Sequence, residues 1–274
     1  MSLRKEIKAW KSGNLLFERY TYRGGKNQPL DAHSHPEYQI GLAVNTLGKY
    51  VFRQGSRYTP PKSLSVIHSG DTHRPDGVFP DDKKFGYLML YVSPVEMLAA
   101  ARESGWHKPD ELPFFKEFTF NNPELMRKYV NLHQLSAQPN ERLAVDVEKT
   151  VFLTLLVKNF SQTKQPDARL TAHRKAILTA RDYLDAHYTE QISLDELACV
   201  AAISKYHLCR KFGETIGVPP HVYQYQLRLN RAKRLLVEKR DISDIAIELG
   251  FYDQSHFGKY FKKFAGATPR TYAE

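Results

Sequence analysis

The chain has 274 residues, 42% of them hydrophobic, which is enough for one large domain or two ordinary ones. It contains no apolar run of about 18 residues that could span a membrane, and its first residues, MSLRKEIKAW, lack a secretory signal. The net charge of +10 favours polyanionic partners, while two cysteines, Cys199 and Cys209, are too few for a disulfide framework and fit a reducing cytoplasm.

Short alternating or apolar segments recur as far as Val92 and indicate β-strands. Clusters of Gly, Pro, Asn and Asp at 24–27, 60–61, 75–77 and 80–82 separate them as turns. This pattern predicts a small antiparallel β-barrel or sandwich. The predicted strands are Leu15–Tyr22, Tyr38–Val44, Lys49–Phe52, Ser63–His68 and Tyr87–Val92.

Three histidines lie beside these strands. His33 and His35 alternate just before one strand, and His73 follows a later one. Alternate residues of an extended chain share a face, so the imidazoles can point into one cavity. They would bind a divalent metal, line an organic-ligand pocket, or satisfy backbone groups at the barrel rim. Aromatic residues nearby suit a mostly apolar pocket with few polar anchors: Tyr38, Tyr50, Phe52, Tyr87 and Tyr91.

From Pro123 the spacing of apolar residues becomes helical and predicts helices over 123–136 and 141–160. The second helix is apolar over much of its surface, because residues outside its main stripe are also apolar. It therefore either packs wholly against its own barrel or contributes to a homodimer. The stripe is Leu143, Val147, Val151, Leu155 and Leu156, and the residues outside it include Val145, Phe152, Leu153 and Val157.

Residues 161–167 are polar, contain a proline and have no periodicity, which is typical of an interdomain linker. The predicted organisation is a β-rich domain with C-terminal helices at 1–160, a linker at 161–170 and an all-α domain at 171–274. The fold class is therefore α+β with two domains.

The helical domain contains an internal repeat. Five pairs of distinctive residues lie 49 positions apart, and Leu197-Ala198 matches Ile245-Ala246 at 48, a difference that a turn can absorb. A match of this kind indicates a duplicated unit. The five pairs are His207-Leu208 with His256-Phe257, Phe212 with Phe261, Gly217 with Gly266, Pro220 with Pro269, and Tyr223 with Tyr272.

Each copy has the layout of a helix-turn-helix motif, over about 193–215 and 242–265. In the first, Ser193 to Glu196 forms a capping box and Ser204 caps a second helix. In the second, Ser243-Asp244 opens one helix, Gly250 supplies the turn and Asp253 caps the next.

Between the copies, residues 221–236 predict a helix of roughly 24 Å at 1.5 Å per residue. With the flanking units, this would place the two recognition helices about one DNA turn, near 34 Å, apart. Seven basic residues and only Glu214 as an acid lie between Lys205 and Arg234, which suits a DNA-facing surface.

From about Ala172 onwards the chain resembles the DNA-binding domain of the AraC/XylS family of bacterial regulators. Ile242 to Tyr272 follows the family signature almost throughout, and Ile192 to Phe212 follows the first-motif pattern. The resemblance implies a seven-helix domain that binds promoter DNA in the cytoplasm and works with RNA polymerase, most often as an activator.

The resemblance also assigns base-contacting positions to the second helix of each motif. Cys209 departs from the pattern in kind, because a thiol cannot make a bidentate base contact, so specificity in the first motif would depend on Arg210. The implied DNA-binding residues are Lys205, Tyr206, Cys209 and Arg210 in the first motif, and Gln254, Ser255, His256 and Lys259 in the second.

Residues 31–42 resemble the start of the cupin-type sensing domain found in this family, which implies a response to a small-molecule effector and no enzyme activity. The effector-site candidates are His33, His35, Tyr38, Gln39 and His73. The alternative is a cupin metalloenzyme, a dioxygenase or isomerase, fused to a DNA-binding tail. Gln39 counts against it, because the cupin metal pattern has a glutamate there. A regulator controlled by a protein partner is a third possibility.

Overall fold

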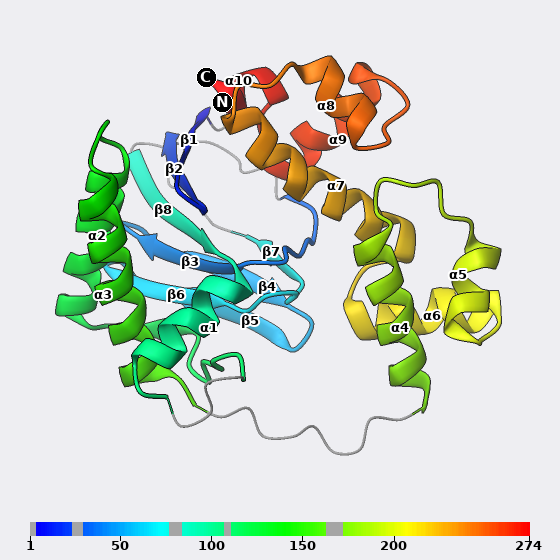
Figure 1. Ribbon diagram of the computed structural model, residues 1–274, viewed down its shortest axis with the longest axis horizontal. Helices are drawn as coiled ribbons and strands as arrows, with labels where there is room; N and C mark the ends of the chain where they lie inside the picture. Colours follow the sequence, from blue (N-terminus) through cyan, green and yellow to red (C-terminus); the bar gives the residue numbers. More distant parts are fainter. Residues whose placement is uncertain (1–3, 24–29, 77–83, 107–110, 163–171) are drawn as a thin grey trace.

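The computed structural model describes residues 4–23, 30–76, 84–106, 111–162 and 172–274 (Figure 1). Two antiparallel sheets make up the N-terminal domain, and they do not close into a continuous barrel. The larger sheet has the order β1 (Arg4–Ser12), β2 (Leu15–Arg23), β8 (Lys84–Val92), β3 (Tyr38–Ala43), β6 (Ser63–Ile67) and β9 (Thr119–Phe120). The smaller has the order β5 (Gly55–Thr59), β4 (Gly48–Phe52) and β7 (His73–Pro75).

The larger sheet separates two apolar layers, because successive side chains of a strand point to opposite faces. Phe17, Ile40 and Leu90 face three helices, α1 (Pro94–Glu103), α2 (Pro123–Ser136) and α3 (Arg142–Phe160), which cover one side of the sheet (Figure 1). Leu16, Met89 and Tyr91 point to the other face and belong to a separate cluster. Tyr50 of the smaller sheet packs with Ile67 of β6, so the space between the two sheets lies on the side away from the helices.

All five predicted strands and both predicted helices of this domain are present, but sequence reasoning missed β1, β5, β7, β9 and α1. β1 was missed because its sequence, RKEIKAWKS, is dominated by charge. Such charge is compatible with an edge strand, whose outer face is solvated. The signal for α1 was available, since Ser93 caps it and Pro94 occupies its first turn.

Seven helices form the C-terminal part, which is described throughout from Ala172. They are α4 (Ala172–Ala186), α5 (Leu194–Ala201), α6 (Lys205–Ile216), α7 (Pro220–Val237), α8 (Ile242–Glu248), α9 (Gln254–Ala265) and α10 (Pro269–Ala273). Leu208 and Phe212 centre one core, and Phe257 and Phe261 centre the other. α7 contributes to both cores and joins the two motifs.

The predicted helix starts are largely confirmed. Ser193 forms a complete capping box with Glu196, and Ser204 and Asp253 accept hydrogen bonds from backbone N–H groups at the starts of α6 and α9. The prediction for α8 was wrong, because its cap is Asp241, which accepts from the N–H groups of Ser243 and Asp244. The helix therefore begins at Ile242, and Asp241 accepts hydrogen bonds from two of the free backbone N–H groups of its first turn.

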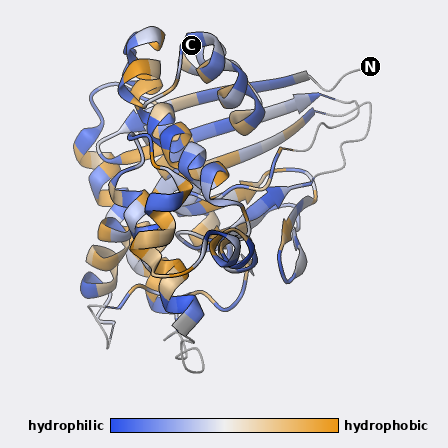
Figure 2. Cartoon of the chain, turned by 90° about the vertical axis from the view of Figure 1, so that its right-hand side faces the viewer, coloured by the Kyte–Doolittle hydropathy of each residue, from blue (hydrophilic) through white to orange (hydrophobic). Residues whose placement is uncertain are grey.

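Part of the predicted organisation falls on residues outside the described ranges. These are the turn clusters at 24–27 and 80–82, Gly77, and most of the predicted linker, since 163–171 are not described. No described helix is long and apolar enough to cross a membrane, and hydrophilic residues recur along the helices in Figure 2.

Candidate DNA interface and effector site

α6 presents a polar, cationic face to solvent. Lys205, Tyr206, Cys209 and Arg210 are all exposed, and Tyr206 retains 73% of its accessible surface. Two of the cations are paired: Arg210 Nε donates to Glu214 at 3.1 Å, and Lys205 Nζ lies 2.8 Å from Asp195. DNA would therefore compete with surface carboxylates for these side chains, which costs little because exposed ion pairs are weak.

α9 presents Gln254, Ser255 and Lys259 in the same way. His256 differs from the prediction that it faces outward, because its half-buried ring packs against Tyr225, Phe251 and Tyr260. Its Nδ1 is buried and has no hydrogen-bond partner among the described residues. This ring supports the start of α9, and only part of it is available to DNA.

The turns of the two motifs repeat the same geometry. Ala202 and Gly250 both have a positive φ, 52° and 73°, and the residue after each donates its N–H five residues back, to Ala198 and Ala246 respectively. The one-residue difference in the repeat lies just after this point, where Tyr252 is an additional residue with 91% exposure. The expectation that a turn absorbs the difference is confirmed.

His33, His35 and His73 come together, as predicted. Their ring centroids lie 4.5 Å (His33 to His73) and 5.0 Å (His35 to His73) apart, and an antiparallel bridge joins His33 to His73. Tyr50, Phe52 and Tyr91 provide rings within 6.1 Å of His73 or His35. The cluster thus has an apolar wall and three imidazoles.

The three histidines are neutral near pH 7. Burial lowers the pKa of His33 to about 4, lowers that of His35, and lowers that of His73 well below its usual range. Each Nδ1 lies 2.8 to 2.9 Å from a backbone carbonyl oxygen two residues away. An Nδ1–H that donates to a carbonyl leaves Nε2 as an acceptor. Within the described ranges, no group of three His, Cys, Asp or Glu side chains is arranged to hold a metal ion.

The other two candidate residues for the effector site, Gln39 and Tyr38, lie in different places. Gln39 lies with the cluster, its Oε1 2.9 Å from His35 Nε2. Tyr38 points to the opposite face of β3, where its hydroxyl donates to Pro113 O and its ring packs on His68 and Phe115. The alternation of side chains along a strand puts adjacent residues on different faces, so Tyr38 is not brought to the histidine cluster.

A buried ionic network that sequence reasoning missed joins the two domains. Glu18 of β2 is fully buried, and its Oε1 lies 2.6 Å from Lys233 Nζ of α7. The hydroxyls of Tyr20, Tyr91 and Tyr272 also donate to its carboxylate. Burial opposes ionisation of Glu18, but the charge of Lys233 and these hydrogen bonds outweigh it and lower the pKa.

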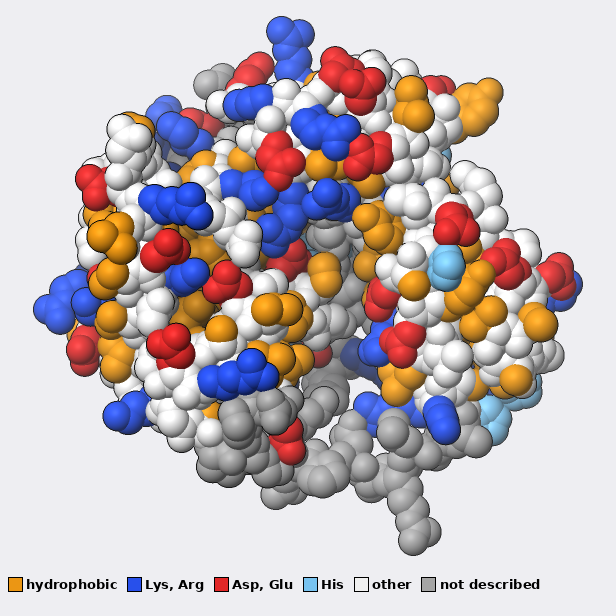
Figure 3. All heavy atoms as spheres, in the orientation of Figure 1, with side chains coloured by type: hydrophobic (Ala, Val, Ile, Leu, Met, Phe, Trp, Pro, Cys, Tyr) orange, Lys and Arg blue, Asp and Glu red, His pale blue; other side chains and the backbone are white. Residues whose placement is uncertain are grey.

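The histidine segment itself is held by α7. Gln226 accepts from the N–H of Ser34 at 3.1 Å and donates to Ala32 O at 2.9 Å, and Asn230 donates to Ser34 O at 2.9 Å. Arg234 forms an ion pair with Glu37 at 2.6 Å. Figure 3 shows Lys and Arg side chains gathered where α7 passes the edge of the larger sheet. The segment that carries His33 and His35 therefore contacts the helix that joins both DNA-binding motifs.

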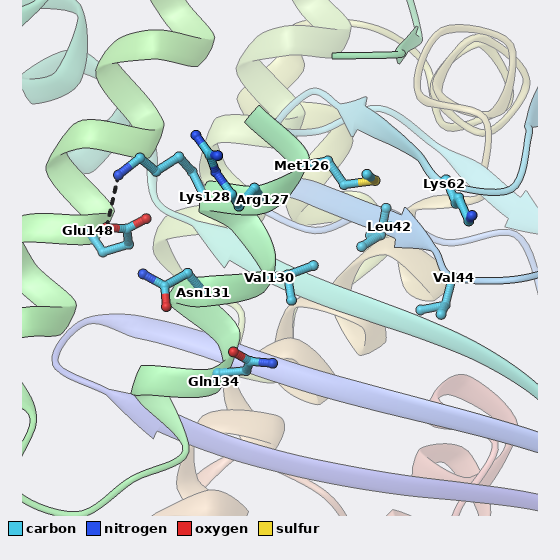
Figure 4. Close-up of a pocket in the computed structure, with 10 residues that line it drawn as sticks. All are labelled: Leu42, Val44, Lys62, Met126, Arg127, Lys128, Val130, Asn131, Gln134 and Glu148. Atoms are coloured by element: carbon cyan, nitrogen blue, oxygen red, sulfur yellow. Dashed lines mark hydrogen bonds and ion pairs between the residues drawn. The ribbon is translucent and has the colours of Figure 1, made fainter. Parts of the chain in front are cut away.

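A second concave feature lies on the helix side of the larger sheet (Figure 4). This groove of about 630 Å³ has a floor of Leu42, Val44, Met126 and Val130. Lys128 contacts Glu148 at 3.4 Å on its rim. It is separate from the histidine cluster, since Leu42 packs in the layer that the helices cover.

Comparison with known proteins agrees with this architecture. Residues 18–152 match the AraC-like ligand binding domain model, and residues 197–274 match a helix-turn-helix domain model. The chain is 29% identical over 247 residues to the uncharacterized HTH-type transcriptional regulator YbfI of Bacillus subtilis, covering 89% of this chain and 86% of YbfI. It is 23% identical over 260 residues to YdeC of the same organism, another HTH-type transcriptional regulator, covering 90% and 87%.

Among solved structures, ToxT from Vibrio cholerae has the same fold, with a TM-score of 0.63 at 15% identity over 96% of each chain. The two family models match the two structural domains, in the same order along the chain. The chain belongs to the AraC family of DNA-binding transcription regulators, with an AraC-like ligand-binding domain ahead of its two helix-turn-helix motifs.

Proposed function

We propose that this protein is a small-molecule-responsive regulator that reads two successive major grooves of promoter DNA. The observation that carries the proposal is the equivalence of the two motifs on one connecting helix. Arg210 and Lys259 occupy matching positions on α6 and α9, and both are exposed. The 18 residues of α7 span about 27 Å at 1.5 Å per residue, so with the flanking units the recognition helices suit grooves about 34 Å apart.

Guanine methylation interference tests this reading. The probe is a duplex selected by the full-length protein from a random-sequence library. Two clusters of interfering major-groove guanines about 10 base pairs apart, on one face of the duplex, are expected. A single cluster would show that only one motif reads bases.

We propose that the histidine cluster is the effector site. Neutral imidazoles with acceptor Nε2 atoms on His33 and His73 favour a ligand whose polar end donates hydrogen bonds. Its apolar part would lie against Tyr50, Phe52 and Tyr91. The solved neighbour ToxT was crystallised with an unsaturated fatty acid, which supports a small-molecule site in this architecture. The contacts of Gln226 and Asn230 with residues 32–34 give an effector a route to the DNA-binding motifs through α7.

Native mass spectrometry of the purified full-length protein tests the effector site. We expect a retained small molecule that His33→Gln and His35→Gln release while thermal stability and DNA affinity are kept. Release of the bound species by a chelator alone would identify a divalent metal at the three histidines and would support the metalloenzyme alternative. Retention by both variants would remove these histidines from the site.

The remaining partners follow from this proposal. Because the target is DNA, we place the protein in the compartment of the bacterial chromosome, the cytoplasm, acting without enzyme activity of its own. A homodimer through α3 is supported by the exposure of Leu143 and Val147. RNA polymerase is the proposed partner for activation, and transcription in vitro from the selected site with purified polymerase measures the sign of regulation.

A further inference from the structure

The second motif contacts the loop that leads into the first motif, in addition to being joined to the first motif through α7. The loop between α4 and α5 reaches the turn of the second motif at Gly250, and Arg228 of α7 lies between them with 3% of its surface exposed. Its guanidinium donates to three carbonyl oxygens, from Nε to Tyr188 at 2.6 Å, from Nη2 to Glu190 at 2.9 Å and from Nη1 to Gly250 at 2.5 Å. One side chain of α7 therefore links the α4–α5 loop, which leads into the first motif, to the turn of the second motif.

Arg228 forms no ion pair with a carboxylate in the described part of the chain. Burial lowers the pKa of its guanidinium, and the three carbonyl dipoles take the place of water around the charge. Gln224, one turn earlier on α7, donates to the same Tyr188 and Glu190 carbonyls at 3.2 and 2.8 Å. A buried cation with only backbone acceptors is held in one geometry, since charge-assisted bonds are strong and directional.

The repeat offers an internal comparison for Gly250. The equivalent turn residue of the first motif is Ala202, which adopts the same left-handed conformation with φ of 52°. The conformation alone therefore does not require glycine. At position 250 a Cβ would lie 2.3 Å from Thr189 O and 3.2 Å from Arg228 Cζ. Glycine is required there because the α4–α5 loop and Arg228 pack against the turn.

We propose that Arg228 and Gly250 are positioning residues that fix the second motif against the first and so set the half-site spacing that the protein accepts. The inference rests on the proposed function, in which both motifs read one duplex. A single helix can bend and twist between two bodies, and a direct contact removes that freedom. One base pair changes the separation of two half-sites by about 3.4 Å and rotates one half-site about the DNA axis by roughly 35°. Two recognition helices held in a fixed relative position therefore bind the altered site with lower affinity.

The test compares DNA affinity for the selected duplex, for duplexes with one base pair inserted or removed between the half-sites, and for single half-sites. Wild-type protein is expected to lose at least about tenfold in affinity on a one-base-pair change, as for a mismatched site. Arg228→Gln and Gly250→Ala should reduce this loss to about twofold while leaving half-site affinity unchanged. Ala202→Gly is the matched control and should keep the wild-type spacing preference.

Half-site affinity and thermal melting separate positioning from folding. If Arg228→Gln fails to fold, Gln224→Leu takes its place, because it removes bonds to two of the same carbonyls without leaving a buried charge unpaired. Folded variants that keep the wild-type spacing preference would overturn the positioning role of Arg228 and Gly250 alone. A wild-type protein whose DNA affinity does not depend on half-site spacing would overturn both this positioning role and the proposed reading of two grooves.

Discussion

Arg210 and Lys259 are separated by the 49-residue offset of the repeat and lie on the exposed faces of α6 and α9. Their surroundings differ. Arg210 is engaged by Glu214 on its own helix, whereas no ion pair is recorded for Lys259 among the described residues. Cys209 beside Arg210 adds no strong donor, so the guanidinium carries most of the base-reading capacity of α6.

Replacing Arg210 or Lys259 with alanine should weaken binding to the selected site by about 1–3 kcal/mol, because each would lose a major-groove base contact. Affinity for random DNA should fall much less. Fluorescence anisotropy on both probes measures the difference, with Lys262→Ala, an exposed change at the C-terminal end of α9, as the control. Equal losses on both probes would show that these residues contact phosphate only.

His133 of α2 is a buried histidine outside the proposed sites. Its ring lies among Trp10, Phe17 and Tyr129, and neither ring nitrogen has a hydrogen-bond partner in the described part of the chain. Burial lowers its pKa to about 3. The unfolded chain, with a histidine pKa near 6.5, therefore takes up this proton first as the pH falls.

The contribution of His133 to the free energy of unfolding should accordingly be fully present above about pH 6.5 and decrease as the pH falls toward 3. By pH 5 the loss should be about 2 kcal/mol. His133→Phe should remove this share of the loss, so its advantage over wild type grows as the pH decreases. Chemical denaturation between pH 7 and 5 measures it. The exposed His221→Phe is the control, and a pH-independent difference would contradict the argument.

At the scale of the element, α3 divides its apolar residues between two surfaces. Phe152, Leu153 and Leu156 are buried in the core under the larger sheet, whereas Leu143 and Val147 are 79% and 54% exposed. Val151 and Leu155 are half-buried at the boundary. The helix is thus core on one side and leaves apolar residues uncovered on the other, toward its N-terminal half.

If the proposed dimer forms through α3, we expect Leu143→Glu with Val147→Glu to give a folded monomer, because carboxylates cannot be buried unpaired in an apolar interface. Sedimentation velocity gives the mass, and circular dichroism monitors the fold. Asn159→Glu, an exposed change on the same helix, should remain dimeric. A wild-type monomer would contradict the proposed dimer, and a double variant that still dimerises would place the interface elsewhere.

At the scale of the whole molecule, the interface between the two domains contains buried charged side chains. Lys5 of β1 also takes part: it donates to Ala265 O, and burial lowers its pKa to about 8. Ile7 of the same strand packs into the core of the second motif. The edge strand of the sensing domain therefore completes the helical domain, and the orientation of the motifs depends on this junction.

Glu18→Gln should cost the full-length protein about 3–5 kcal/mol of unfolding free energy, since it leaves Lys233 buried without a counter-charge. Adding Lys233→Met should recover much of the loss. The exposed interdomain pair Lys11–Glu238 is the matched control, and breaking it should cost less than about 1 kcal/mol. Additive effects of Glu18→Gln and Lys233→Met in a double-mutant cycle would contradict a direct pairing.

The amino-acid sequence by itself determined the helical half and its function. Helix starts depend on a cap and the next three residues, and the repeat, the turns and most of the exposed recognition faces are visible in short stretches such as 193–212 and 242–265. The start of α8 and the packing of His256 are the exceptions. The predicted helix over 123–136 also matches α2. These features are local, so they can be read without knowing where the rest of the chain lies.

Tertiary structure alone decided the order of the strands, the separation of Tyr38 from the histidine cluster, and the junction between domains. Glu18 pairs with Lys233, 215 positions away, and Arg228 takes its acceptors from the α4–α5 loop and from the turn of the second motif. No local pattern distinguishes these residues from ordinary surface charges. Their roles come from burial, because a charge becomes a structural link only where the fold removes water and supplies its partner.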